Sequence, residues 1–277
     1  MAVAEDYLYG AIAGDIIGSP YEMCNIKSTE FTLFTPWSNF TDDTVMTLAV
    51  AKWLTEDRTH SIEPLIKYMQ ELGLEYPDAG YGEKFKEWLI QESPKPYESW
   101  GNGSAMRVSP VGLYSNTIDE ALALATLTAS VSHNHPEGIK GAQAIAACVF
   151  LCKEGKGKNA IKKYIEDTFN YDLNRTIADI RKDYHFDVSC SGSVPEAIIS
   201  FLEGNSFEGV IRLAISIGGD SDTIACMAGG IAACKYPIPK NIRNTCREIL
   251  PERLKIIMCD FKRIVESRRK RTILRFL

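Results

Sequence analysis

Residues 218–233 read GGDSDTIACMAGGIAA, and this stretch combines two features of a buried helix. Asp220, Asp222 and Thr223 come first, and carboxylates at a helix N-terminus are stabilised by free backbone N–H groups and by the helix dipole. Small residues then stand where an ordinary core helix would carry leucine. Small side chains let two helix backbones approach closely. The stretch therefore predicts a tightly packed central helix with acids at its start.

Helical periodicity dominates the rest of the chain. No clear run of alternating β-branched residues lies between turn dipeptides, so strands are not expected. Short loops rich in Gly, Pro, Asn and Asp separate the periodic segments. We predict a single compact all-α domain over residues 1–277, with helices at about 5–18, 43–56, 61–73, 81–92, 117–131, 137–153, 158–168, 194–203, 207–217, 222–234, 239–249 and 252–272.

The composition restricts the classes of protein to which the chain can belong. Of the 277 residues, 45% are hydrophobic and 24% are charged, as in ordinary globular proteins. A net charge of −5 disfavours a nucleic-acid backbone as the main partner. The eight cysteines include no Cys-x-x-Cys pair, and four lie in apolar helical runs, which is typical of reduced thiols. No signal peptide or membrane span is expected, so we predict a cytoplasmic protein.

A second acidic cluster lies near the N-terminus. Residues 40–44 read FTDDT and precede another run of small and apolar residues. A helix N-terminus accounts for one or two acids, but four converging carboxylates repel each other in a buried place unless a cation neutralises them. Oxygen-only ligands favour hard cations such as Mg²⁺, Ca²⁺ or Mn²⁺. The two clusters therefore look like the halves of one metal site.

A glycine-rich loop, SWGNGSAMR at 99–107, is the third informative stretch. Small residues precede a helical-looking segment there, an arrangement whose free N–H groups can bind phosphate oxygens. The aromatic Trp100 in such a loop would suit stacking on a base. A plain turn is the alternative interpretation of the same residues.

Two further stretches have both an ordinary and a functional interpretation. Residues 132–138 read SHNHPEG, and His-x-His without a third ligand nearby is a poor zinc signal. Capping by Ser132 or Asn134, with Pro136 starting the next helix, explains much of it, although a histidine could reach into a site. Residues 14–22 read GDIIGSPYE, where the GSP triplet predicts a helix stop that leaves Glu22 on a loop.

Together the five stretches resemble one family, the ADP-ribosylglycohydrolases of the dinitrogenase-reductase-activating type. The motifs occur in the family's order between Gly10 and about Pro237. The resemblance implies an all-α fold and a centre of two Mg²⁺ ions, with Mn²⁺ as an alternative. Its implied metal ligands are Thr41, Asp42, Asp43, Asp220, Asp222 and Thr223. The implied substrate-binding residues are Trp100 near the adenine, Gly101, Asn102, Gly103 and Ser104 at the diphosphate, and His133.

The implied activity is Mg²⁺-dependent removal of ADP-ribose from a modified acceptor. Arginine is the default acceptor, with serine, another O-linked group or a nucleobase as alternatives. Asp43 or Asp220 would accept the proton of the attacking water, and Glu22 would assist or gate. Residues 191–195 resemble a substrate-side loop. The competing interpretation is a non-catalytic ADP-ribose-binding or crystallin-like relative, which would have lost metal ligands that this chain retains.

Partners and assembly follow from the same resemblance. The substrate would be an ADP-ribosylated protein or small molecule, and nucleic acid would matter only as a modified substrate. A monomer that does not associate with membranes is the simplest expectation for one compact domain. Residues after Pro237 match no motif and are assigned no site.

Overall fold

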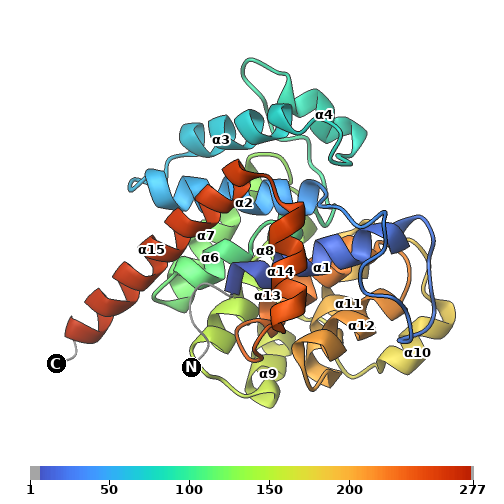
Figure 1. Cartoon of the computed structure of the whole chain (residues 1–277). Helices are drawn as coiled ribbons and strands as arrows, with labels where there is room; N and C mark the ends of the chain where they lie inside the picture. The colour runs from blue at the N-terminus through green and yellow to red at the C-terminus, as the bar shows by residue number, and fades with distance from the viewer. Residues whose placement is uncertain (1–6, 276–277) are drawn as a thin grey trace.

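The computed structural model describes residues 7–275, and the regular elements in that range are all helices (Figure 1). Gly101 and Ser189 form an isolated antiparallel bridge. The predicted all-α fold is confirmed. The helices are α1 (Tyr7–Glu22), α2 (Asp42–Glu56), α3 (Ile62–Glu75), α4 (Glu83–Leu89), α5 (Gly103–Met106), α6 (Ser109–Tyr114), α7 (Ile118–Ser130), α8 (Pro136–Lys153), α9 (Lys158–Phe169), α10 (Ile177–Asp183), α11 (Cys190–Glu203), α12 (Phe207–Ser216), α13 (Ser221–Ala232), α14 (Lys240–Ile249) and α15 (Glu252–Arg275).

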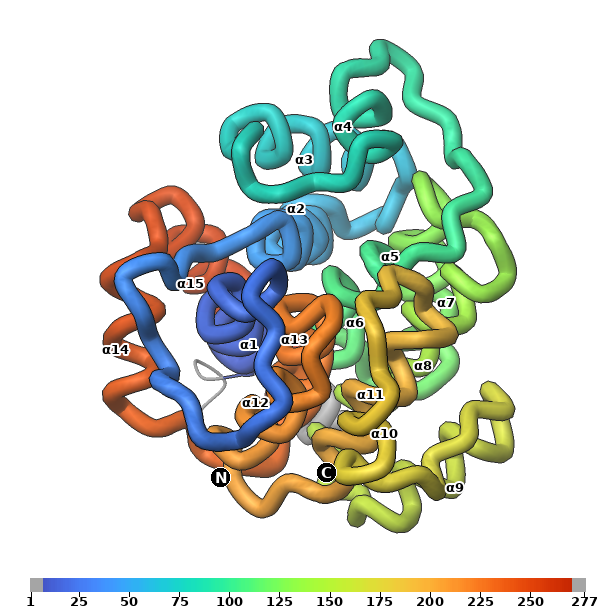
Figure 2. Tube along the Cα trace, turned by 90° about the vertical axis from the view of Figure 1, so that its right-hand side faces the viewer, coloured from blue at the N-terminus to red at the C-terminus, as the bar shows by residue number. Residues whose placement is uncertain are grey.

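Helix α13 is the centre of the fold, since every one of its residues is buried. It packs against α1, α11, α12 and α8, and Figure 2 shows α1 and α13 side by side. Glycines at every fourth position of α1 make this contact. A Cβ atom added at Gly14 would lie 2.0 Å from the Ala225 carbonyl oxygen, and one at Gly18 would lie 2.5 Å from Asp222 Cα. The tight packing predicted for the 218–233 stretch is therefore present.

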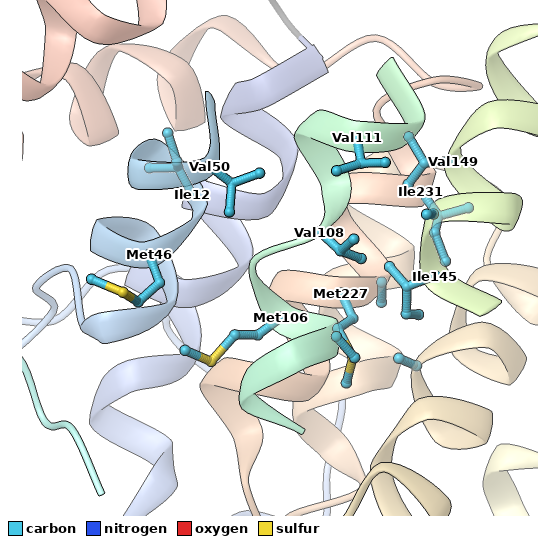
Figure 3. Packing of buried hydrophobic residues seen from close by; sticks show 14 of the residues in the cluster. Ile12, Met46, Val50, Met106, Val108, Val111, Ile145, Val149, Met227 and Ile231 are labelled. Atoms are coloured by element: carbon cyan, nitrogen blue, oxygen red, sulfur yellow. The ribbon is translucent and has the colours of Figure 1, made fainter. Parts of the chain in front are cut away.

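Apolar side chains fill the space between the central pair and the surrounding helices. Figure 3 shows Ile12 of α1, Met46 of α2 and Met227 of α13 among the buried side chains, together with residues of α6 and α8. Helix α2 also packs against α3 and α15 on the other side of the core. This packing fixes the starts of α2 and α13, which carry the two acidic clusters.

The predicted end of the first helix was wrong. Helix α1 continues through Pro20 to Glu22, so Glu22 lies in its last turn rather than on a loop. Proline has no N–H to donate to the carbonyl four residues earlier, which normally costs stability. Here the hydroxyl of Ser19 donates to that carbonyl, on Ile16, at 3.1 Å. The local side-chain bond replaces the missing backbone bond.

Other differences concern short or unusual helices. Helices α6 and α10 were not predicted, and α5 was expected only as a helical-looking segment without bounds, because segments of four to seven residues are too short to show periodicity. Residues 191–195, which resemble a substrate-side loop, lie in the first turns of α11, which begins at Cys190 rather than at the predicted 194. Ser189 caps that helix by accepting a hydrogen bond from Gly192 N–H at 3.0 Å.

The state of the cysteines agrees with the reduced thiols expected from the sequence. All eight cysteines are free thiols, and Cys148, Cys152 and Cys226 are buried. None of the helices described between residues 7 and 275 is both long enough and apolar enough to cross a membrane.

Candidate metal centre and substrate cavity

A glycine turn aims the second acidic cluster into the interior. Gly218 and Gly219 have φ angles of 75° and 72°, a conformation that favours glycine. Asn25 holds the turn, because its Oδ1 accepts from Gly219 N–H at 2.6 Å and its Nδ2 donates to the Gly219 carbonyl at 3.0 Å. The chain then enters α13 with Asp220 as its N-cap and Asp222 in its first turn.

Asp15 positions the first acidic cluster. This residue of α1 is fully buried, and its carboxylate accepts hydrogen bonds from the N–H groups of Thr41 and Thr44 at 3.0 and 3.1 Å. It also accepts from the Thr41 hydroxyl at 2.7 Å. Asp15 therefore fixes the start of α2, where Asp42 and Asp43 lie.

The two clusters meet as predicted. The Thr223 hydroxyl donates to Asp43 Oδ2 at 3.0 Å, although the two residues are 180 positions apart. Within each of two groups, one carboxylate oxygen from each residue lies within 4.8 Å of the corresponding oxygens of the others. Asp15, Asp43 and Asp222 form the first group, and Glu22, Asp220 and Asp222 form the second. Asp222 belongs to both, so the groups are adjacent.

The chemistry of this donor set fits hard cations. Asp43 Oδ1 is buried and has no hydrogen-bond partner among residues 7–275, although such an oxygen is costly to leave unsatisfied. The hydroxyl protons of Thr41 and Thr223 are already given to carboxylates. Thr41 Oγ1 also accepts from Asp43 N–H at 3.3 Å, which leaves one lone pair on the Thr41 oxygen and the lone pairs of the Thr223 oxygen available. Carboxylate and hydroxyl oxygens are the ligands that Mg²⁺ and Mn²⁺ prefer.

The acids are strongly perturbed without a cation. Burial raises the pKa of Asp15 to about 6, despite four hydrogen bonds that favour its charged form. Burial and then the neighbouring carboxylates raise the pKa of Asp42 to about 8. The same two causes raise the pKa of Asp43 and Asp222 well above the ordinary value. Such mutual destabilisation is what a bound cation would relieve.

A cavity of about 490 Å³ opens over the acids. Its lining includes all six predicted metal ligands together with Glu22, which faces the cavity from the last turn of α1. The lining also includes Gly101–Gly103, Tyr97 and the start of α4. Phe186 and Val188 complete the rim. A ligand in this cavity would therefore be within reach of both the acids and the glycine loop, which the hydrogen bond from Asn102 to Asp220 joins.

The glycine loop is only partly available to a ligand. Gly101 N–H donates to Ser99 Oγ, and Asn102 N–H donates to the Val188 carbonyl at 2.7 Å. The Asn102 side chain donates to Asp220 Oδ2 at 2.7 Å, so this residue orients an acid of the candidate metal centre. The Ser104 hydroxyl is buried and donates to the Gly138 carbonyl. Of residues 101–104, Gly103 and Ser104 have N–H groups with no partner among the described residues, and of these two only Gly103 lines the cavity.

Trp100 does not lie where the sequence interpretation placed it. Its side chain is 58% exposed, meets His135 edge-on at 5.9 Å between ring centroids, and does not line the cavity. The loop turns this indole outward, because the Gly101–Ser189 bridge ties the neighbouring backbone to the start of α11. Phe186 is 52% exposed and is the most exposed aromatic side chain of the lining, since Tyr97 is half-buried and Phe85 is buried, so it is the one best available for stacking.

The two histidines of residues 132–138 have different roles. His133 is buried and lines the cavity. His135 is the N-cap of α8 and accepts a hydrogen bond from Glu137 N–H at 3.1 Å, so the predicted cap at Ser132 or Asn134 was wrong. Pro136 does start that helix, as predicted. His135 lies outside the cavity lining.

Sequence reasoning missed two residues of the site. Asp15 lies inside a quoted motif but was assigned no role, because a lone acid within a helix usually faces solvent. Its position beside the glycine face of α1 was the available signal. Arg107 lines the cavity although it is only 1% exposed. An arginine at the end of a glycine loop gives no sequence sign that it is buried.

A protein-family model and several known proteins match this chain. The family model described as ADP-ribosylglycohydrolase matches residues 4–272. The human ADP-ribosylhydrolase ARH3 is 26% identical over 318 residues, covering 86% of this chain and 87% of that protein. An uncharacterized Archaeoglobus fulgidus protein is 25% identical over 274 residues, covering 84% of this chain and 88% of its own.

Two further matches differ in how much of the chain they cover. The Pseudomonas putida ADP-ribosylarginine hydrolase Tri1 is 24% identical over 144 residues, covering 50% of this chain and 39% of that protein. A solved structure entitled ADP-ribosylglycohydrolase-related protein complex superposes with a TM-score of 0.70 at 22% identity, covering 95% of this chain and 97% of the other. The superposition supports the all-α fold.

Proposed function

The chain belongs to the ADP-ribosylglycohydrolase family, and on that premise we propose that it is a Mg²⁺-dependent hydrolase that removes ADP-ribose from a modified acceptor. The observation that carries the proposal is the meeting of two acidic groups at Asp222 beneath a cavity of substrate size. A non-catalytic ADP-ribose-binding role is disfavoured, because such a protein would have no need to keep these buried, mutually repelling acids together.

Six residues would hold the metal ions: Thr41, Asp42, Asp43, Asp220, Asp222 and Thr223. When bound, two Mg²⁺ or Mn²⁺ ions supply Lewis-acid charge that orients ribose hydroxyls and activates a water. Asn102 fixes the orientation of the Asp220 carboxylate by donating to Oδ2. Asp15 fixes Thr41 by accepting a hydrogen bond from its hydroxyl.

Glu22 is the residue best placed to move a proton. Its carboxylate has no hydrogen-bond partner among residues 7–275 and lines the cavity beside Asp220 and Asp222. Burial and the charge of Asp220 raise its pKa above the ordinary value, which suits a general base. Asp43 and Asp220 are the alternatives, but each already accepts a hydrogen bond from a neighbouring side chain. Glu22 would accept the proton of the attacking water and return it to the leaving group.

On the substrate side, the diphosphate would lie against the free N–H group of Gly103, beside His133. The adenine would stack on Phe186 at the rim. Arginine remains the default acceptor, and the partial match to an ADP-ribosylarginine hydrolase supports it. Serine, other O-linked and nucleobase-linked acceptors are the alternatives that an assay must separate.

The test is release of ADP-ribose from matched arginine-, serine- and nucleobase-linked substrates by metal-stripped protein, with Mg²⁺, with Mn²⁺ and with neither. We expect release that depends on added metal, and little release by Glu22→Gln. Calorimetric binding of ADP-ribose is measured in parallel. Tight binding with no release from any substrate would establish the non-catalytic alternative instead.

A further inference from the structure

Arg107 is a buried cation that has no carboxylate partner in the described part of the chain. Its Nη2 donates to the Thr128 carbonyl at 2.6 Å and to Ser132 Oγ at 2.9 Å. Its Nε is buried and has no hydrogen-bond partner. A guanidinium carries donors and no acceptor. The Ser132 oxygen must therefore accept in its contact with Arg107.

Because the Ser132 oxygen accepts from Arg107, the Ser132 hydroxyl proton must go to another neighbour, and this determines the protonation of His133. The side chain of Ser132 is fully buried, and its only other hydrogen-bond neighbour among residues 7–275 is His133 Nδ1, at 2.8 Å. If His133 Nδ1 carried a proton, the hydroxyl proton of Ser132 would have no acceptor, at a cost of about 1–3 kcal/mol. The hydroxyl therefore donates to Nδ1, which is left unprotonated.

A neutral imidazole with an unprotonated Nδ1 carries its proton on Nε2. A doubly protonated His133 would place a second positive charge beside Arg107 away from water, and burial followed by that neighbouring charge lowers the pKa of His133 well below its ordinary value. The ring is therefore neutral near pH 7. Its donor and acceptor positions are both determined.

The free end of the ring faces the ligand. A Cβ atom added at Gly103 would lie 3.0 Å from His133 Nε2, and one at Gly101 would lie 3.5 Å from it. Nε2 has no partner among the described residues, and His133 lines the cavity. The Nε2–H group therefore lies beside Gly103 at the cavity, where an oxygen acceptor would be bound.

We propose that Arg107 and Ser132 are positioning residues that hold His133 as its Nε2–H tautomer, so that the ring donates a hydrogen bond to a phosphoryl-type oxygen of the ligand. In this arrangement His133 takes no proton from the substrate, and proton transfer is left to the carboxylates. The identity of the ligand rests on the proposed function, whereas the tautomer does not.

The tautomer can be read directly by ¹⁵N NMR of the wild-type protein with labelled histidine. The chain has four histidines, and glutamine variants of His60, His135 and His185 assign the fourth ring by elimination. We expect His133 at pH 7 to show an unprotonated Nδ1 and a protonated Nε2, with or without Mg²⁺. A protonated Nδ1, in either the other tautomer or the imidazolium, would overturn the proposal.

Variants of Ser132 test the positioning role. Ser132→Ala should release the tautomer and weaken ADP-ribose binding about ten-fold, equivalent to about 1.4 kcal/mol, while Ser132→Thr should keep the protonated Nε2. Ser115→Ala is the matched control, because Ser115 is equally buried but donates to the Val111 carbonyl outside the cavity. It should change neither signal nor affinity.

The outcomes separate this proposal from the proposed function. If Ser132→Ala keeps both the Nε2–H signal and wild-type affinity, Ser132 does not position the ring and the proposal is wrong. If Ser132→Ala does not fold, the wild-type spectrum still decides the tautomer. If the wild-type protein binds no ADP-ribose, the proposed function fails, and the spectrum still shows whether Arg107 and Ser132 fix the ring.

Discussion

The contact between α1 and α13 can be tested with Gly14→Ala. The added Cβ would lie 2.0 Å from the Ala225 carbonyl oxygen and 2.7 Å from the Cys226 nitrogen, both backbone atoms that no rotamer change can move. Ordinary contact begins at 3.4 Å. The two helices must therefore part by about 1 Å or more to restore contact distance. Asp15, the next residue, would move away from Asp222 with its helix.

The energetic cost follows from two opposing terms. Overpacking a well-packed core typically costs about 1–3 kcal/mol, and a clash with backbone belongs at the upper end. Alanine in a helix interior gains back up to about 1 kcal/mol over glycine. A net loss of roughly 2 kcal/mol corresponds to a melting temperature lower by roughly 4–8 °C. Stabilisation by added Mg²⁺ should shrink as well, because the acids are misplaced.

Melting curves in EDTA and in Mg²⁺ would measure both effects. Gly157→Ala is the control, because a Cβ there meets nothing within 4 Å, and its cost as a lost glycine N-cap should stay below about 1 kcal/mol. If Gly14→Ala melts within about 1 °C of the wild type and keeps the full Mg²⁺ shift, the glycine contact does not position the acids.

Three further predictions concern the cavity and its acids. Phe186→Ala should weaken ADP-ribose binding about ten-fold or more, with little effect on the binding of ribose 5-phosphate. Trp100→Ala should change the affinity for neither ligand. The reverse pattern in calorimetry would show that Trp100, not Phe186, stacks on the adenine. Gly103→Val should raise the Kd for ADP-ribose, because a side chain there blocks the loop N–H and meets the histidine ring; unchanged affinity in a folded variant would exclude the loop. In EDTA, the melting temperature should fall as the pH rises from about 4 to about 8. Burial raises the pKa of Asp15 to about 6 and of Asp42 to about 8, so in this range the folded chain holds protons that the unfolded chain has lost. A steady rise of the melting temperature with pH would contradict this sign.

The parts of the site that lie at helix starts could be predicted from the sequence. Asp42, Asp43, Asp220 and Asp222 head small-residue helices, and a local pattern was enough to bring the two clusters together. The extension of α1 was not predictable from Pro20, because the Ser19 hydroxyl supplies the hydrogen bond that the proline lacks.

Side chains in loops were predicted less well, because their directions depend on distant contacts. The bridge to Ser189 turns Trp100 outward, and Phe186 reaches the cavity from a segment that carries no motif. Arg107 became recognisable only when its buried contacts with Thr128 and Ser132 were visible. The single-domain, monomeric and cytoplasmic expectations stay predictions.

Calorimetric titration of metal-stripped protein with Mg²⁺ tests whether the two acidic groups form one metal centre. We predict that the wild type binds two ions per chain. Asp222→Asn should bind fewer and more weakly, because Asp222 belongs to both groups. It should also melt higher than the wild type in EDTA, since one buried carboxylate is gone. Wild-type protein that binds no Mg²⁺, or an Asp222→Asn variant that binds two ions with unchanged affinity, would contradict the metal centre proposed here.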